Sequence, residues 1–226
     1  MEVETLQKNV TNILETLSQN RYKDSAPARL IAVTKTVSTA IIDMLKPLQV
    51  LDIAENRAQA LLEKLPNIAP EFRLHWIGRL QTNKVKYIIR HVCLLHTLDR
   101  IALAQEVDRH AGMTGRVLPV LVQVNIAQEP QKTGLDSVDV KPFLQSLRGF
   151  PNIRVKGLMA MMPFTSDELQ LTAWFQKMRT LFDQIKSDAI GGVHMEELSM
   201  GMSNDYEIAA REGATMVRVG SALFQP

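Results

Sequence analysis

The sequence predicts an α/β protein whose single domain, residues 1–226, is a closed (β/α)8 TIM barrel. Short apolar runs typical of buried strands alternate with segments of helical periodicity, and the chain contains eight such pairs. Regular alternation favours a parallel sheet with right-handed crossovers, and eight units favour closure over an open doubly wound sheet. Because 46% of the residues are hydrophobic and no linker interrupts the chain, we expect one sizeable core.

The expected strands are apolar runs bounded by polar or turn residues. The run at 197–200 has the weakest support, and without it an open sheet becomes the better fold. The eight predicted strands cover 30–33, 50–54, 72–77, 93–96, 117–126, 153–159, 197–200 and 215–220.

The expected helices are indicated by apolar residues at helical spacing or by a capping side chain. Leu6, Val10 and Ile13 show this spacing in the first helix, and Asp99 and Asp167 are suited to cap two later ones. The predicted helices cover 3–18, 39–48, 56–65, 82–92, 99–110, 140–147, 167–187 and 204–212.

Composition argues against several classes of partner. A net charge of +2 and an aromatic content of 5% give no basis for binding nucleic acid or an anionic membrane. Glu2, Glu4 and Lys8 do not fit a signal peptide, and no apolar run approaches membrane-spanning length. The lone Cys93 excludes an internal disulfide. We therefore expect a cytoplasmic protein, and a monomer because no extra apolar helix is left for an interface.

Lys35 stands at the carboxyl end of the first predicted strand, where barrel proteins place function. Strand alternation puts it on the same face as Ile31 and Val33. We expect its amine to be partly desolvated there and available as a nucleophile towards an aldehyde. The alternative is a lysine that extends past the strand end into solvent.

Two glycine-containing loops after the last two strands suit an anion. Gly201 allows backbone N–H groups to approach a ligand closely, Gly220 and Ser221 offer the same from the next strand, and Ser203 is placed to cap the following helix. The loops after strands seven and eight are a recurrent phosphate site in barrels. The alternative is a pair of ordinary turns with a helix cap.

Arg218 is expected to point into the barrel. If Val217 and Val219 face the helices, alternation turns Arg218 inward, where a permanently charged side chain needs an acceptor. A pyridine nitrogen would serve, and so would a salt bridge to Glu55 or Glu197. Met159 ends the sixth strand on the face predicted to carry residues 155 and 157, so it either packs on a ligand ring or fills the core.

A nucleophilic lysine, a phosphate site and an inward arginine on one rim suit pyridoxal 5′-phosphate (PLP). The amine would form a Schiff base with the cofactor aldehyde, the loops would hold the phosphate dianion, and the arginine would face the ring nitrogen. Such an arginine, unlike an aspartate, would keep the pyridine unprotonated.

Sequence motifs that carry a family resemblance span nearly the whole chain in order. They are Ala32-Val-Thr-Lys35, Glu55-Asn56, His75-Trp-Ile-Gly78 with Leu80-Gln-Thr-Asn-Lys84, His96-Thr-Leu-Asp-Arg100, Gln123-Val-Asn125 with Lys132-Thr-Gly134, Gly157-Leu-Met159, Leu198-Ser-Met-Gly-Met-Ser203 and Met216-Val-Arg-Val-Gly220. Through them the sequence resembles the pyridoxal phosphate homeostasis protein family, which is itself similar to the N-terminal barrel domain of alanine racemase.

The resemblance implies roles for particular residues. It implies that Lys35 is the Schiff-base lysine, that Arg218 faces the ring nitrogen, and that Asn56 and Ser199 make secondary contacts. Phosphate would be held by Ser203, Gly220 and Ser221. The family is associated with vitamin B6 and amino-acid homeostasis. One departure is Ala54, which stands where the family usually has glycine and adds a methyl group near Asn56.

Three functions remain open from the sequence. Racemase chemistry needs a second acid or base opposite the lysine, which a second domain supplies in the racemases and this chain is expected to lack. A holder of PLP without turnover is therefore favoured, with PLP-dependent apoenzymes as candidate recipients. The alternatives are a PLP-dependent amino-acid racemase or related lyase and a cofactor-free lysine aldolase. The five histidines show no metal-ligand spacing, and His75 and His96 are expected to be hydrogen-bonded in strands.

Overall fold

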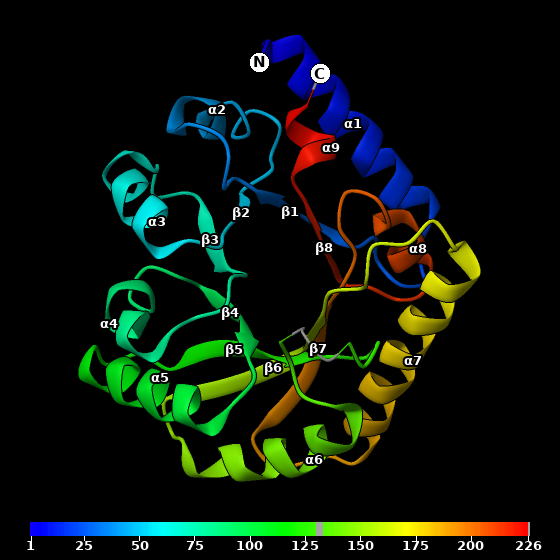
Figure 1. Cartoon of the computed structure of the whole chain (residues 1–226). Helices are drawn as coiled ribbons and strands as arrows, with labels where there is room; N and C mark the ends of the chain where they lie inside the picture. Colours follow the sequence, from blue (N-terminus) through cyan, green and yellow to red (C-terminus); the bar gives the residue numbers. More distant parts are fainter. Residues whose placement is uncertain (130–132, 226) are drawn as a thin grey trace.

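Eight parallel strands close into one barrel in the order β1 to β8, in a computed structural model that describes residues 1–129 and 133–225 (Figure 1). The strands are β1 Arg29–Val33, β2 Asp52–Glu55, β3 Arg73–Trp76, β4 Leu94–Leu98, β5 Leu118–Val124, β6 Ile153–Ala160, β7 Val193–Ser199 and β8 Met216–Val219. Pairing of β1 with β8, from Arg29 opposite Met216 to Ala32 opposite Val219, closes the ring. The predicted closed barrel is confirmed.

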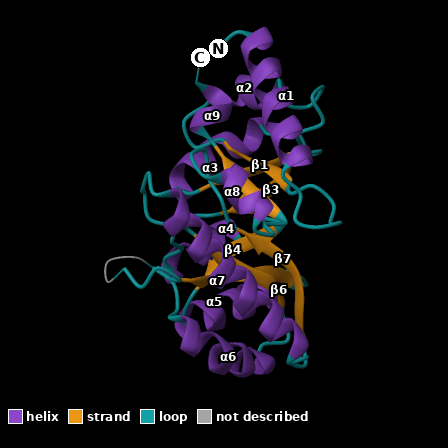
Figure 2. Cartoon of the chain, turned by 90° about the vertical axis from the view of Figure 1, so that its right-hand side faces the viewer, coloured by secondary structure: helices purple, strands orange, loops and turns teal. Residues whose placement is uncertain are grey.

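Helices surround the strands on the outside, as the two perpendicular views show (Figures 1 and 2). They are α1 Val3–Gln19, α2 Thr39–Asp43, α3 Ala58–Lys64, α4 Val85–Ile88, α5 Ile101–Met113, α6 Ser137–Ser146, α7 Glu168–Ser187, α8 Tyr206–Arg211 and α9 Ser221–Phe224, with 3-10 turns at Leu65–Asn67, Thr82–Lys84 and Leu147–Gly149. Among the described residues, no helix is long and apolar enough to cross a membrane.

Element boundaries differ from the predictions in several places. The seventh strand begins at Val193 and is the full-length strand β7 rather than a four-residue one. The helix predicted over 82–92 is a 3-10 turn followed by the short α4. Asp167 caps α7 as predicted, because its Oδ1 accepts the Gln170 backbone N–H at 3.0 Å, whereas α5 is preceded by Arg100 and not capped by Asp99. Helix α9 was not predicted.

Apolar side chains pack in two layers. The larger layer lies between strands and helices and includes Val217 and Val219, as alternation predicted. The smaller fills the barrel interior, and it consists of Ile31, Val33, Ala54, Leu94, Leu121, Met159 and Met216. Arg218, between the two valines, therefore points inward.

The predicted shared face of residues 155 and 159 is wrong. Val155 belongs to the outer layer and Met159 to the interior cluster. The register of β6 shifts between Val155 and Gly157, so one extra residue reverses the alternation. Gly157 has φ +150°, and a Cβ at this position would lie 1.8 Å from the Glu197 carbonyl oxygen. Only glycine fits this close approach of two strands.

The two ends of the described chain lie side by side at the rim of the barrel (Figure 1). Asn9 on α1 donates hydrogen bonds from Nδ2 to the carbonyl oxygens of Leu223 at 3.1 Å and Gln225 at 3.0 Å. The first helix therefore holds α9 in place. Lys132, which belongs to one of the family motifs, lies outside the described residues.

Candidate functional site

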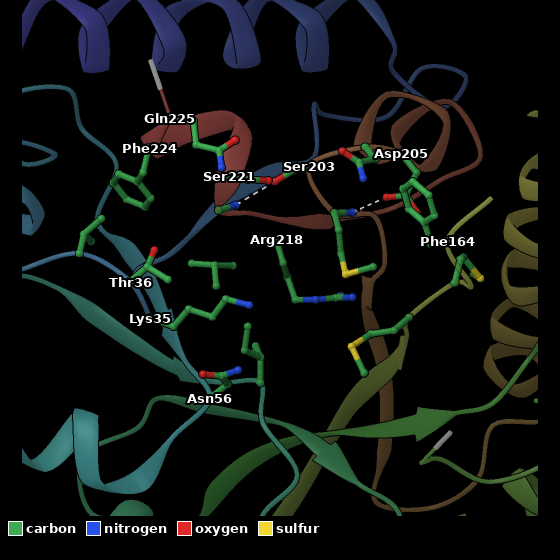
Figure 3. Close-up of a pocket in the computed structure, with 18 of the residues that line it drawn as sticks. Lys35, Thr36, Asn56, Phe164, Ser203, Asp205, Arg218, Ser221, Phe224 and Gln225 are labelled. Atoms are coloured by element: carbon green, nitrogen blue, oxygen red, sulfur yellow. Dashed lines mark hydrogen bonds between the residues drawn. The ribbon is translucent and has the colours of Figure 1, made fainter. Parts of the chain in front are cut away.

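A cavity of about 700 Å³ opens at the carboxyl ends of the strands (Figure 3). Its walls come from the segments that follow β1, β2, β3, β6, β7 and β8, and from α9. Six of the eight residues predicted for the site line this cavity. They are Lys35, Asn56, Ser203, Arg218, Gly220 and Ser221.

Lys35 extends into the cavity from the turn after β1 (Figure 3). The expected partial desolvation is wrong, because Lys35 is exposed: β1 ends two residues earlier, and the cavity is open to solvent. Within 1–129 and 133–225 its amine has no hydrogen-bond or ion-pair partner. The amine is therefore free to react with a ligand.

The backbone just before Lys35 is held by a buried clamp formed by Thr34, Glu55 and Lys64. Lys64 Nζ donates to the Thr34 carbonyl oxygen at 2.8 Å and to Glu55 Oε1 at 2.7 Å, and Thr34 Oγ1 donates to the same carboxylate oxygen at 2.8 Å. The Glu55 side chain is fully buried. The clamp fixes the point from which Lys35 enters the cavity, and no sequence pattern predicted it.

The two loops predicted to bind an anion meet across the rim. Ser203 does not cap α8, which begins at Tyr206 with Asp205 at its N-cap position. Instead the Ser203 hydroxyl oxygen accepts the backbone N–H group of Gly220 at 3.2 Å (Figure 3). It also accepts the backbone N–H group of Ala222 at 3.3 Å. An oxygen of an incoming anion can be received by the same donors.

Gly201 allows the first of these loops to pack tightly. Its φ is +92°, and a Cβ here would lie 2.6 Å from the Cβ of Ala209. The Gly201 carbonyl oxygen accepts the Arg218 backbone N–H at 3.0 Å. The loop after β7 is thereby fixed against β8, which places Ser203 beside Gly220.

Arg218 lies at the cavity floor and is only 3% exposed. Its Nη1 donates to Ser199 Oγ at 2.7 Å and its Nη2 to the Ala160 carbonyl oxygen at 2.8 Å. Burial lowers the pKa of Arg218 to about 10, against the opposing effect of the Asp205 carboxylate. The group remains a cation at neutral pH.

The salt bridge considered for Arg218 is absent from the described residues. Glu55 belongs to the clamp beside Lys35, and Glu197 pairs with Arg29 at 2.5 Å. Arg218 therefore has neutral acceptors, and it lines the cavity without a carboxylate partner.

Two predicted site residues lie below the cavity. Met159 and Ser199 are both fully buried and do not line it. Met159 fills the interior, and Ser199 reaches the site only through Arg218.

The cavity is also lined by three residues that were not predicted, Met161, Phe164 and Phe224 (Figure 3 labels the two aromatic residues). Phe224 is carried by a helix of four residues, too short to produce a periodic signal. Among the described residues no cluster of histidine, cysteine or carboxylates could hold a metal ion.

The fold and the cavity define a (β/α)8 barrel with a free lysine, a buried arginine and a pair of anion-suited loops at one rim. Residues 3–226 match the family model described as alanine racemase, N-terminal domain. An alanine racemase structure from Clostridium difficile shares the fold with a TM-score of 0.74 at 16% identity, over 96% of this chain and 56% of that one.

More similar proteins identify the family. The pyridoxal phosphate homeostasis protein of Aquifex aeolicus is 37% identical over 198 residues, which are 87% of this chain and 86% of that protein. The structure of PipY from Synechococcus elongatus, described with PLP bound, has a TM-score of 0.85 at 29% identity, over 97% of this chain and 99% of that one. The chain belongs to the pyridoxal phosphate homeostasis protein family.

Proposed function

We propose that this protein binds PLP in the cavity as a Schiff base on Lys35 and takes part in vitamin B6 and amino-acid homeostasis without catalytic turnover. The observation that carries the proposal is the convergence of Lys35, Arg218 and the Ser203 and Gly220 loops on one cavity. The relatives support it, because they are named for PLP homeostasis and PipY is described with PLP bound.

The residues present fit this cofactor. The unpartnered Lys35 amine can attack the aldehyde carbon, so that a C=N bond replaces C=O and water leaves. Ser203, Gly220 and Ser221 offer a hydroxyl and backbone N–H groups to the phosphate, and Arg218 is the residue for the ring nitrogen.

Asn56 has an unsatisfied hydrogen-bond acceptor that a ligand could satisfy. Its Oδ1 is buried at the cavity wall and, among the described residues, accepts no hydrogen bond. Buried acceptors are rarely left unsatisfied, so a donor on a bound ligand fits this position.

Bound PLP supplies an electron sink, and Arg218 would limit its strength. A guanidinium can only donate hydrogen bonds and does not readily supply a proton, so the ring nitrogen opposite it would stay unprotonated. The described residues that line the cavity include no tyrosine or histidine that could act opposite Lys35. Asp205 is occupied by the Met202 backbone N–H, which donates to its carboxylate at 2.5 Å.

Titration of purified protein with PLP tests the covalent link. We expect the unaltered protein to develop the absorbance of a Schiff base, and Lys35→Ala to lose it and bind PLP more weakly. Lys177→Ala, which removes an exposed lysine on α7, is the matched control and should behave as the unaltered protein. Equal affinity of Lys35→Ala and the unaltered protein would show that the Schiff-base assignment is wrong.

Exchange of the substrate α-proton with solvent deuterium tests the absence of turnover. We expect no exchange at enzymatic rates, about 1 per second or faster, with any common amino acid. Exchange at such a rate that also depends on Lys35 would favour the alternative, a PLP-dependent racemase or related lyase.

A further inference from the structure

A line of buried polar side chains crosses the barrel interior and ends at the cavity floor. Asp52 on β2, His75 on β3, His96 on β4, Ser199 on β7 and Arg218 on β8 are each at most 5% exposed. Successive contacts are 2.9 Å from Asp52 Oδ1 to His75 Nε2, 2.9 Å from His75 Nδ1 to His96 Nε2, and 3.0 Å from His96 Nδ1 to Ser199 Oγ. Arg218 Nη1 completes the line at 2.7 Å from the same hydroxyl oxygen.

Hydrogen-bond chemistry fixes the direction of this line from the Arg218 end. A guanidinium only donates, so the Ser199 oxygen accepts from it. Among the described residues, His96 Nδ1 is then the one acceptor within reach of the Ser199 O–H. His96 therefore carries its proton on Nε2 and donates it to His75 Nδ1, and His75 in turn donates from Nε2 to Asp52. Each hydrogen bond in the line is therefore donated in the direction of Asp52, and each imidazole ring carries one nitrogen-bound proton.

Both ends of the line suit this direction. Arg73 donates to the Asp52 carboxylate at 2.7 Å and 2.6 Å. Although burial alone would raise the pKa of Asp52, the hydrogen bonds from Arg73 and His75 outweigh it and hold the pKa well below its usual range. Burial, with the nearby His75 and Arg218, holds the pKa of His96 well below its usual range. An anionic acceptor at one end and a cationic donor at the other leave no buried group in the line unpaired.

We propose that His96, backed by His75 and Asp52, is a positioning residue for Arg218: by accepting the Ser199 proton it leaves the hydroxyl oxygen free to hold the guanidinium. Ser199 and the Ala160 carbonyl oxygen then fix two nitrogens of the group, which is presented to the cavity as an oriented donor. The effect on ligand binding rests on the proposed function, because it requires PLP to face Arg218. The direction of the hydrogen bonds does not depend on the proposed function.

Imidazole nitrogen resonances of the ¹⁵N-labelled, cofactor-free protein test the direction. We expect His75 and His96 each to be singly protonated on Nε2 in long-range ¹H–¹⁵N spectra at neutral pH. A proton on Nδ1 of His96 would overturn the proposal. Since this measurement involves no cofactor, it decides the direction even if the protein fails to bind PLP.

Binding measurements test the positioning role. We expect Ser199→Ala and His96→Leu each to weaken PLP binding about tenfold, because each removes support from a charged hydrogen bond. The double variant should bind PLP no more weakly than the single variant with the lower affinity, because both changes interrupt the same line of hydrogen bonds. Thr97→Val is the matched control: it removes a buried hydroxyl beside His96 that donates to the Gly78 carbonyl oxygen, outside the line.

The control variant should bind PLP within about twofold of the unaltered protein. Wild-type affinity in folded His96→Leu would overturn the positioning role, and so would additive losses in the double variant. If the unaltered protein itself does not bind PLP at Lys35, the proposed function fails, and the tautomer of His96 still decides the direction of the line.

Discussion

At the residue scale, the site depends on contacts between residues that are distant in sequence. Alternation alone predicted that Arg218 turns inward, because the period of a strand is a local property. The same rule failed for Val155 and Met159, since the register of β6 shifts between Val155 and Gly157, where the strand lies too close to the Glu197 backbone for a Cβ. It also could not show that Ser203 binds the loop after β8, because that contact is set by the closure of the barrel.

Lys64 should be important for stability because of the carboxylate it holds. Lys64→Met would leave Glu55 buried without its cation, and we expect the free energy of unfolding to fall by about 3–5 kcal/mol in urea denaturation. Lys46→Met is the matched control, because the Lys46–Glu71 pair is solvent-exposed and should contribute little to stability. Equal losses in the two variants would contradict the buried clamp.

His96 should make the protein less stable in acid. Its pKa is lowered in the folded state, so the unfolded chain binds more protons once the pH falls below the unfolded value of about 6.5. Stability from this group is fully present above that pH and is lost as pH falls towards the folded pKa, with a slope of up to about 1.4 kcal/mol per pH unit. Urea denaturation at a series of pH values from 8 to 5 measures this slope.

The pH series needs two variants for its interpretation. His96→Leu should flatten the slope, whereas Thr97→Val, which leaves the histidine in place, should keep it. An unchanged slope in His96→Leu would mean that other groups, such as His91 and His110, account for the acid sensitivity; burial lowers the pKa of both in the folded protein.

At the element scale, the strands were predicted better than the helices that shape the rim. Each strand was marked by a run of apolar residues. The exception is β7, which was predicted only at its last residues because apolar side chains alternate with polar and charged ones in its earlier part. The four residues of α9 are too short for helical periodicity. Because α9 carries Phe224, this part of the cavity wall was missed with it.

Helix α1 should influence the cavity through α9. Asn9→Ala removes the two hydrogen bonds to the carbonyl oxygens of Leu223 and Gln225, and we expect about 1–2 kcal/mol lower stability together with weaker PLP binding. Asn12→Ala, on the exposed face of the same helix, is the control. Calorimetry compares the stability of the two variants, and titration compares their affinity for PLP. Unchanged PLP binding in Asn9→Ala would show that the position of α9 does not influence the site.

At the scale of the whole molecule, closure of the barrel assembles the site. Pairing of β1 with β8 brings Lys35 and Arg218 to the same rim, although they are 183 positions apart in the sequence. The eightfold alternation was enough to predict this closure, and the position of function at the carboxyl ends of the strands follows from it. The sequence could not show what stands opposite Lys35, because that depends on how six loops pack together.

Reduction with borohydride tests whether Lys35 is the lysine that carries PLP. The protein is saturated with PLP, reduced and digested, and the modified peptide is identified by mass spectrometry. We expect a stable phosphopyridoxyl group on Lys35, and no such group on this peptide when Lys35→Ala is treated in the same way. Modification of other lysines with Lys35 left free, or complete release of PLP after reduction, would contradict a covalent anchor at the end of β1.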